Sequence, residues 1–149
     1  MTEKVLIGKT MTIIIDSNYL FALKSKKDKK HQRSIELMKE LKENYSKPII
    51  TNNLVISELL TLVNSRFKGK VYYLDEYCKL IWGDDNFFKI VQLLPEQYKE
   101  GYEILKKFTT PKRLLSFVDA SLIFLNKIVN AKAILSFDNH FDGIVSRLY

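Results

Sequence analysis

Short apolar, β-branched runs alternate along this chain with longer helical patterns, and that alternation is what most restricts its fold. The runs are bounded by turn residues and rich in Ile and Val, which favours strands. Strands separated by helices are typical of βαβ units, in which neighbouring strands run parallel. The predicted strands span residues 12–15, 48–51, 88–93 and 132–136, with a short edge strand at 144–148.

The segments between these runs carry residues that begin or end helices. Four helices are predicted: one capped by Ser34 with Ile35, Met38, Leu41 and Tyr45 on one face, one from Asn52 or Asn53 through Phe67, one between Gly69 and Gly83, and one from Pro95 through Phe108. The segment after Asp119 is apolar on almost every side, so a fifth helix is expected in the centre of the fold. The predicted fold class is therefore α/β.

Composition predicts a single globular domain, because the 149 residues are 46% hydrophobic and contain neither an internal repeat nor a Ser/Gly linker. The domain is assigned to residues 11–149, and residues 1–10 to an N-terminal extension without an assigned role. Cys78 is the single cysteine, which excludes a disulfide framework. The apolar runs fall far short of the roughly 20 residues that span a bilayer, so we expect a cytoplasmic protein without a membrane partner.

The chain is strongly basic, with a formal net charge of +7, and this favours an anionic partner, nucleic acid ahead of membrane. The tract KSKKDKKHQR, residues 24–33, has the highest charge density and is the best phosphate-contact candidate. A solvated lysine-rich surface explains the same tract equally well. Tyr72, Tyr73, Tyr77 and Trp82 could stack on bases, although aromatics at helical spacing more often pack in a core or a dimer interface.

Four lone carboxylates interrupt apolar segments of this basic chain. Asp16 ends TIIID, Glu58 lies within LVISELLTLV, Asp119 opens VDASLIFL, and Asp138 follows AILSF. Asp16 and Asp138 fall at the carboxyl ends of predicted strands, where open α/β sheets bind ligands. The predicted helix starts place Asp119 and Glu58 at the same rim.

A divalent cation explains why acids would gather there. Crowded carboxylates repel one another, and an unpaired charge is costly to remove from water. Mg²⁺ or Mn²⁺ binds carboxylate oxygens, polarises a phosphoryl oxygen and lowers the pKa of a bound water. A basic surface around an acidic metal site suits a phosphodiester substrate, because the surface attracts the backbone that the metal cleaves.

Each acid also has a separate structural explanation. Asp16 and Asp119 could be helix N-caps, and Asp138 could belong to a polar turn. Glu58 has no capping role in mid-helix, so its structural alternative is a buried salt bridge. Four independent explanations are then needed in place of one shared site.

The motifs IIIDSNYL, VISELL, SFVDASL and ILSFDNHFD, in this order, resemble those of the PIN domain ribonucleases, including the toxins of VapBC-type toxin–antitoxin pairs. The resemblance covers essentially the whole chain from Met11. It implies a three-layer α/β/α sandwich around a mainly parallel sheet. It also implies Mg²⁺- or Mn²⁺-dependent cleavage of RNA that leaves a 5′-phosphate and a 3′-hydroxyl, a homodimer and, for a toxin, a small antitoxin partner.

By this resemblance Asp16, Glu58, Asp119 and Asp138 form an acidic quartet that binds the metal and carries catalysis. Asp16 and Asp119 correspond to direct metal ligands, and Asp138 to a ligand that binds directly or through water. Glu58 corresponds to a residue that positions the attacking water or a second metal.

Four further residues are candidates by the same resemblance. Ser17 and Asn18 match the small polar residues that follow the first acid, and would orient that acid or the substrate phosphate. Many relatives carry a further acid in the last motif, where this chain has His140, with Asp142 two residues later. The sequence therefore leaves open whether this chain has the fifth acid of the family pattern.

Two other function classes remain open on the sequence alone. The first is a PIN-like module that binds RNA or protein without catalysis. The second is an aspartyl-phosphate phosphotransferase or phosphatase, since an apolar strand that ends in Asp also opens such proteins; the phosphatases carry a second aspartate where this chain has Asn18. Within the nuclease interpretation, a toxin and a stand-alone RNA-processing enzyme are both open.

Overall fold

One five-stranded parallel sheet forms the centre of the computed structural model, which describes residues 11–44, 48–83 and 87–149. The sheet order is β3-β2-β1-β4-β5, and every neighbouring pair runs parallel. The strands are β1 Ile13–Ile15, β2 Ile49–Asn52, β3 Phe88–Val91, β4 Ala133–Leu135 and β5 Arg147–Leu148. The predicted extension, residues 1–10, lies outside the described residues.

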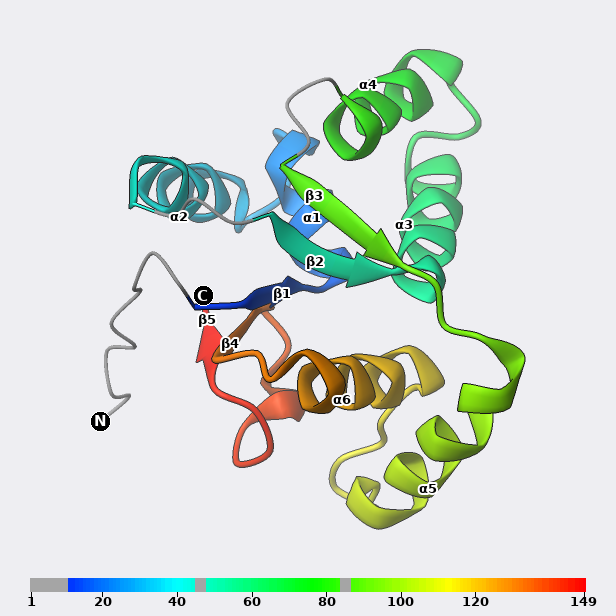
Figure 1. Ribbon diagram of the computed structural model, residues 1–149. Coiled ribbons are helices and arrows are strands. Elements are labelled where there is room, and N and C mark those ends of the chain that lie inside the picture. Colours follow the sequence, from blue (N-terminus) through cyan, green and yellow to red (C-terminus); the bar gives the residue numbers. More distant parts are fainter. Residues whose placement is uncertain (1–10, 45–47, 84–86) are drawn as a thin grey trace.

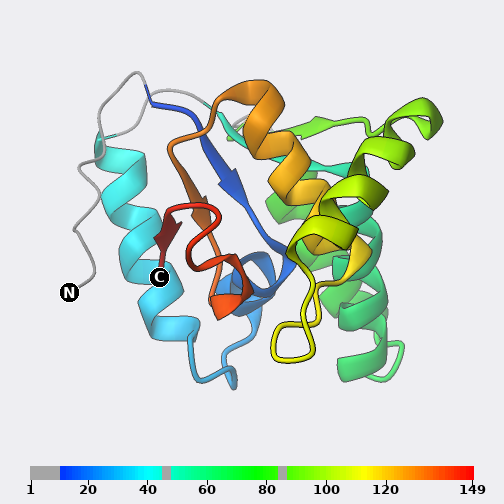
Figure 2. The ribbon, with the colours of Figure 1, turned by 90° about the horizontal axis from the view of Figure 1, so that it is seen from below.

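Among the described residues, six helices cover the sheet in two layers, with α1 to α4 on one face and α5 and α6 on the other (Figures 1 and 2). They are α1 Ser17–Lys24, α2 His31–Asn44, α3 Asn53–Arg66, α4 Val71–Trp82, α5 Tyr98–Phe108 and α6 Phe117–Val129, with short 3-10 turns η1 Pro95–Gln97 and η2 Asn139–Phe141. The predicted three-layer α/β/α fold is confirmed. No helix in the described ranges has the length and apolar character needed to cross a membrane.

The core forms around β1, because this central strand is covered on both faces. Its three isoleucines are at most 1% exposed, as an apolar strand buried on both sides requires. The predicted central helix is α6, whose residues from Asp119 to Leu125 are all buried. Helix α6 contacts β1 and β2, and its Ser121 accepts a hydrogen bond from Asn52 at the carboxyl end of β2, which fixes the first half of α6 relative to that edge.

The predicted start of α2 was wrong. The helix begins at His31 rather than after Ser34, because Asp28 closes the preceding turn: its carboxylate accepts from the Lys30 amide at 2.8 Å and its carbonyl from the His31 amide at 3.0 Å. The Ser34 hydroxyl donates to the His31 carbonyl within the helix. Ile35 is 41% exposed instead of buried, and Tyr45 lies outside the described residues. Similarly, Pro95 opens the turn η1 and the helix α5 begins at Tyr98.

Asn52 connects the start of α3 to α6. Its side-chain oxygen accepts from the Val55 amide at 3.0 Å, and its side-chain nitrogen donates to Ser121 Oγ at 2.9 Å. Asn52 and Ser121 are at most 1% exposed, so solvent cannot replace either bond. This contact fixes the direction of the helix that carries Glu58.

We expect Asn52→Ala to lower the free energy of unfolding by about 2 kcal/mol, because it removes a helix cap and leaves a buried hydroxyl without its donor. Urea denaturation measures the loss. The matched control is Asn44→Ala, at an exposed residue near the end of α2, where a change below about 0.5 kcal/mol is expected. Equal losses in the two variants would contradict the structural role of Asn52.

Candidate functional site

Asp16 lies directly after β1 and caps α1. It is 3% exposed, and its Oδ1 accepts from the Ser17 amide at 2.7 Å. Its Oδ2 accepts from Ser136 Oγ at 2.8 Å and from the Asn18 side-chain amide at 3.3 Å. Ser136 follows β4, the strand that pairs with β1. The buried carboxylate therefore connects two adjacent strands at their carboxyl ends.

Burial is the main reason that the pKa of Asp16 is raised to about 7. The hydrogen bond from Ser136 opposes this effect, whereas the nearby Asp119 carboxylate strengthens it; the Ser17 amide lowers the pKa and Glu58 raises it. The carboxylates of Asp119 and Glu58 are therefore close enough to Asp16 to disfavour its ionised form. A bound cation would favour the ionised form of Asp16, because it reverses the local charge.

Asp119 lies in the first turn of α6 and takes part in a reciprocal helix cap. Its Oδ2 accepts from the Ser116 amide at 3.0 Å, and Ser116 Oγ accepts from the Asp119 amide at 3.0 Å. The structural alternative for this residue, a capping role, is thus realised. The cap also fixes the carboxylate, which is 8% exposed, at the rim of the sheet.

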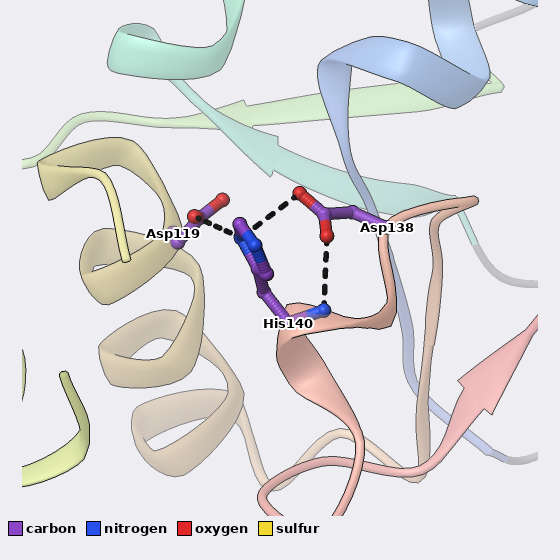
Figure 3. Close-up of side chains that lie close together, drawn as sticks. All are labelled: Asp119, Asp138 and His140. Carbon is purple, nitrogen blue, oxygen red and sulfur yellow. Dashed lines mark hydrogen bonds and ion pairs between the residues drawn. The ribbon is translucent and has the colours of Figure 1, made fainter. Parts of the chain in front are cut away.

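Asp119, Asp138 and His140 converge from two segments far apart in the sequence (Figure 3). His140 Nδ1 lies 3.6 Å from Asp119 Oδ2 and 3.3 Å from Asp138 Oδ2. The His140 backbone amide donates to Asp138 Oδ1 at 2.9 Å, which closes the turn that brings the ring back to the acids. One ligand atom from each residue lies within 4.8 Å of the other two.

This donor set fits a divalent metal. Although Nδ1 of His140 is buried and within ion-pair distance of both acids, it meets hydrogen-bond geometry with no described residue. Carboxylate oxygens suit Mg²⁺ and Mn²⁺, and an imidazole nitrogen is more readily accepted by Mn²⁺. Asp119, Asp138 and His140 could therefore hold such an ion, with Asp16 connected to them through Ser136, whose Oγ accepts from the Asp138 amide at 3.0 Å.

Glu58 is exposed, although its sequence neighbours are apolar. The Ser17 hydroxyl donates to Glu58 Oε1, so α1 and α3 meet at this carboxylate. The alternative of a buried salt bridge is not realised in the described residues, where Glu58 has no ion pair. Through Ser17, the Glu58 carboxylate is therefore held near Asp16.

Asn18 and Asp142 have different places in the structure. Asn18 Oδ1 accepts from the Phe137 amide at 3.1 Å and its Nδ2 donates to Ser136 Oγ at 3.2 Å, which ties α1 to the loop after β4. Asp142 instead accepts from Arg147 at 2.8 and 3.1 Å, and this hydrogen-bonded pair lowers the pKa of Asp142. Asp142 is occupied by Arg147 and is not one of the converging residues.

A shallow cavity of about 600 Å³ adjoins the acids. Asn18, Phe137 and Asp138 line it together with Lys30 and Arg147. The Lys30 ammonium lies 5.6 Å from the centre of the Phe137 ring. Arg147 is already paired with Asp142, whereas Lys30 is exposed and lies beside the acidic rim, where it could contact a substrate phosphate.

Sequence reasoning missed Ser136 and Ser116. Ser116 precedes Asp119 by three residues, and this spacing is close to the capping-box pattern that could have revealed it. Ser136 has no comparable signal, because its contacts with Asp16 and Asp138 depend on the shape of the loop after β4.

A sequence model of the PIN domain family matches residues 13–145, a span that contains all the converging residues. The chain belongs to the PIN domain family. The family resemblance inferred from the four motifs is thereby confirmed. No curated protein sequence matches this chain.

Solved structures share the PIN fold with this chain. Mycobacterium tuberculosis VapC20, described as a sarcin-ricin loop cleaving toxin, superimposes with a TM-score of 0.72 at 20% identity, covering 91% of this chain and 98% of VapC20. A chain of Rickettsia felis VapBC2, solved with a promoter DNA fragment, superimposes with a TM-score of 0.62 at 15% identity, covering 93% of this chain and 98% of that chain. Pyrobaculum aerophilum PAE2754 superimposes with a TM-score of 0.60 at 16% identity, covering 95% of this chain and 91% of PAE2754. At these identities, the likeness establishes the fold.

The raised pKa of Asp16 predicts that this PIN domain loses stability as pH rises. The unfolded carboxyl titrates near 3.8 and the folded one near 7, so the folded state holds more protons between these values. Stability from this group is therefore greatest at low pH, declines up to about pH 7 and is constant above it. Each pKa unit corresponds to about 1.4 kcal/mol, which sets a scale of a few kcal/mol.

Urea denaturation at pH 5 and pH 8, in chelator, measures this decline. Asp16→Asn should flatten it, whereas Asp75→Asn, at an exposed acid on α4, should leave it unchanged. The same decline in wild type and Asp16→Asn would show that Asp16 is not the titrating group.

Proposed function

We propose that this PIN domain protein is a metal-dependent endoribonuclease that hydrolyses RNA phosphodiester bonds. The observation that carries the proposal is the convergence of Asp119, Asp138 and His140 beside the buried Asp16 at the carboxyl edge of the sheet. Chains in this family with such a rim are expected to hold Mg²⁺ or Mn²⁺. The basic charge of the whole chain supports an RNA substrate.

Asp16, Asp119 and Asp138 would hold the metal, with His140 Nδ1 beside the last two. When bound, the metal polarises a phosphoryl oxygen and lowers the pKa of a water ligand. Ser136 and the Ser17 amide hold the Asp16 carboxylate in one orientation through the bonds described above.

Glu58 would hold the attacking water and accept its proton. Its carboxylate is exposed, so substrate and water can reach it, and the Ser17 hydroxyl holds it beside Asp16. In-line attack by the water oxygen forms a new bond to phosphorus as the bond from phosphorus to the 3′ oxygen breaks. The departing 3′ oxygen takes a proton from solvent, which leaves a 5′-phosphate and a 3′-hydroxyl. Lys30, at the cavity beside Asp138, would contact the negatively charged phosphate as it approaches.

The shared fold with VapC20 and VapBC2 motivates a narrower proposal, that the protein is the toxin of a toxin–antitoxin pair. Such a toxin would act in the cytoplasm as a homodimer and be inhibited by a small antitoxin protein. Growth arrest on expression of the wild type, but not of Asp16→Asn, would support this assignment over a stand-alone RNA-processing enzyme.

Purified protein should cleave single-stranded RNA only when Mg²⁺ or Mn²⁺ is present. Asp16→Asn and Asp119→Asn should each reduce cleavage by more than the roughly 10- to 100-fold that is typical of residues supporting a metal ligand. Glu58→Gln should slow cleavage but retain Mn²⁺ binding, because Glu58 acts on water. Gel analysis of end-labelled RNA and calorimetry with Mn²⁺ provide the two measurements.

The matched control is Asp142→Asn, which removes an acid of the same motif that is already paired with Arg147. It should retain cleavage within a few-fold of wild type. Metal-dependent cleavage that survives both Asp16→Asn and Asp119→Asn would refute the site. RNA that binds without being cleaved under any metal condition would favour a non-catalytic binding module.

A further inference from the structure

Two sequence features that the metal site does not use meet in one surface groove. The groove has a volume of about 750 Å³ and lies between the C-terminal end of α1, the loop after it, and the turn from α3 to α4. Figure 1 shows α4 beside this end of α1. The basic tract 24–33 lines one side and the aromatic start of α4 lines the other. We refer to it as the α1–α4 groove.

Positive charge dominates the α1–α4 groove. Its lining contains six exposed cations, Lys24, Lys26, Lys27, Arg66, Lys68 and Lys70, and a single acid, Glu76. Glu76 already pairs with Lys79 at 3.2 Å, and within the described ranges none of the six cations has an ion-pair partner. Like charges gathered without counter-charges repel one another, so an external polyanion would relieve that repulsion.

The turn from α3 to α4 carries two of these cations, Lys68 and Lys70. Lys68 and Gly69 adopt positive φ values of 53° and 72°, and the Gly69 amide donates to the Asn64 carbonyl at 2.9 Å. The left-handed pair reverses the chain within a few residues. Lys68 and Lys70 flank Gly69 in this turn, and both line the groove.

Tyrosine rings line the same groove. Tyr73 stacks on Phe67 with ring centres 3.9 Å apart, and Tyr72 meets Tyr73 edge-on at 5.2 Å. Tyr72 is 67% exposed, so one aromatic ring is open to a ligand. Tyr77 is fully buried, and its hydroxyl donates to the Phe21 carbonyl at 2.6 Å, which fixes α4 against α1. Exposed rings next to cations form the surface on which single-stranded nucleic acid stacks.

Helix α1 sets the distance between the groove and the metal site. Asp16 caps its N-terminal end and Lys24 is its last residue. Its eight residues correspond to about 12 Å at 1.5 Å per residue. A single strand bound over the usual site size of roughly 4–16 nucleotides can therefore occupy both ends of the helix.

We propose that the α1–α4 groove binds single-stranded RNA on one side of the bond that the metal site cleaves, with lysines on the phosphates and Tyr72 on a base. The proposal rests on the proposed ribonuclease function. The exposed tyrosine favours RNA over an acidic protein segment, which needs cations but no stacking ring. The groove thereby sets how the substrate lies across the acids.

Fluorescence anisotropy with a labelled pool of 12-nucleotide single-stranded RNA tests the groove in the full chain, with chelator present to prevent cleavage. The variants are Lys68→Gln with Lys70→Gln, and Tyr72→Ala. Their matched controls are Lys39→Gln with Lys99→Gln, at exposed lysines of α2 and α5, and Tyr102→Ala, at a 52% exposed tyrosine of α5. Calorimetry with Mn²⁺ checks that each variant keeps the metal site.

The double lysine variant should weaken RNA binding by about tenfold and reduce the slope of log K against log salt by about 1.4, or about 0.7 per lost phosphate contact. Tyr72→Ala should weaken binding at least about fivefold without changing that slope. Both should bind Mn²⁺ like the wild type. The controls should stay within about twofold of wild-type RNA affinity.

RNA affinity that changes no more in the groove variants than in the controls would overturn the proposal, even if metal-dependent cleavage is intact. Groove variants that bind RNA normally but lose binding to polyglutamate would overturn it in favour of an acidic protein partner. If wild type binds RNA with the predicted groove dependence yet never cleaves it, the ribonuclease function fails and the groove stands.

Discussion

The buried carboxylate of Asp16 is the interaction on which the arrangement of the site depends. It lies at the end of β1 and receives hydrogen bonds from the next helix, α1, and from Ser136 after the neighbouring strand β4. Since Asp16 is 3% exposed, these donors stand in for water. Any change that moves β1 relative to β4 would therefore break hydrogen bonds to a polar group that solvent cannot reach, which is costly.

The meeting of the acids could be predicted from the sequence because topology largely determines it. Asp16 and Asp138 follow β1 and β4, which pair in parallel, so their carboxyl ends must share an edge. Asp119 follows for a similar reason, since an all-apolar helix has to lie in the core and its first turn must reach the rim. Hydrophobic periodicity and the order of the strands along the chain can both be determined from the sequence.

The detailed contacts could not be predicted in this way. The direction of the His140 ring depends on the η2 turn, which closes through the Asp138 carboxylate, and turns of this kind follow loop geometry rather than periodicity. The start of α2 was missed because Ser34 and Asp28 are both capping residues, and the choice between them depends on the preceding turn. Glu58 was expected at the core edge, but the rotation of α3 exposes it.

Helix α1 explains why a basic protein can keep an acidic rim and a cationic groove apart, because the two lie at opposite ends of this helix. The positive end of the α1 dipole faces the Asp16 carboxylate, and the negative end faces Lys24, so each charge lies where the helix stabilises it. The Tyr77 hydroxyl of α4 donates a hydrogen bond to the Phe21 carbonyl in α1, which holds the two helices together. A shift of α1 along its axis would move Asp16 and Lys24 together. In the proposed RNA complex, the position of the strand in the groove would therefore be coupled to the position of its phosphate at the acids.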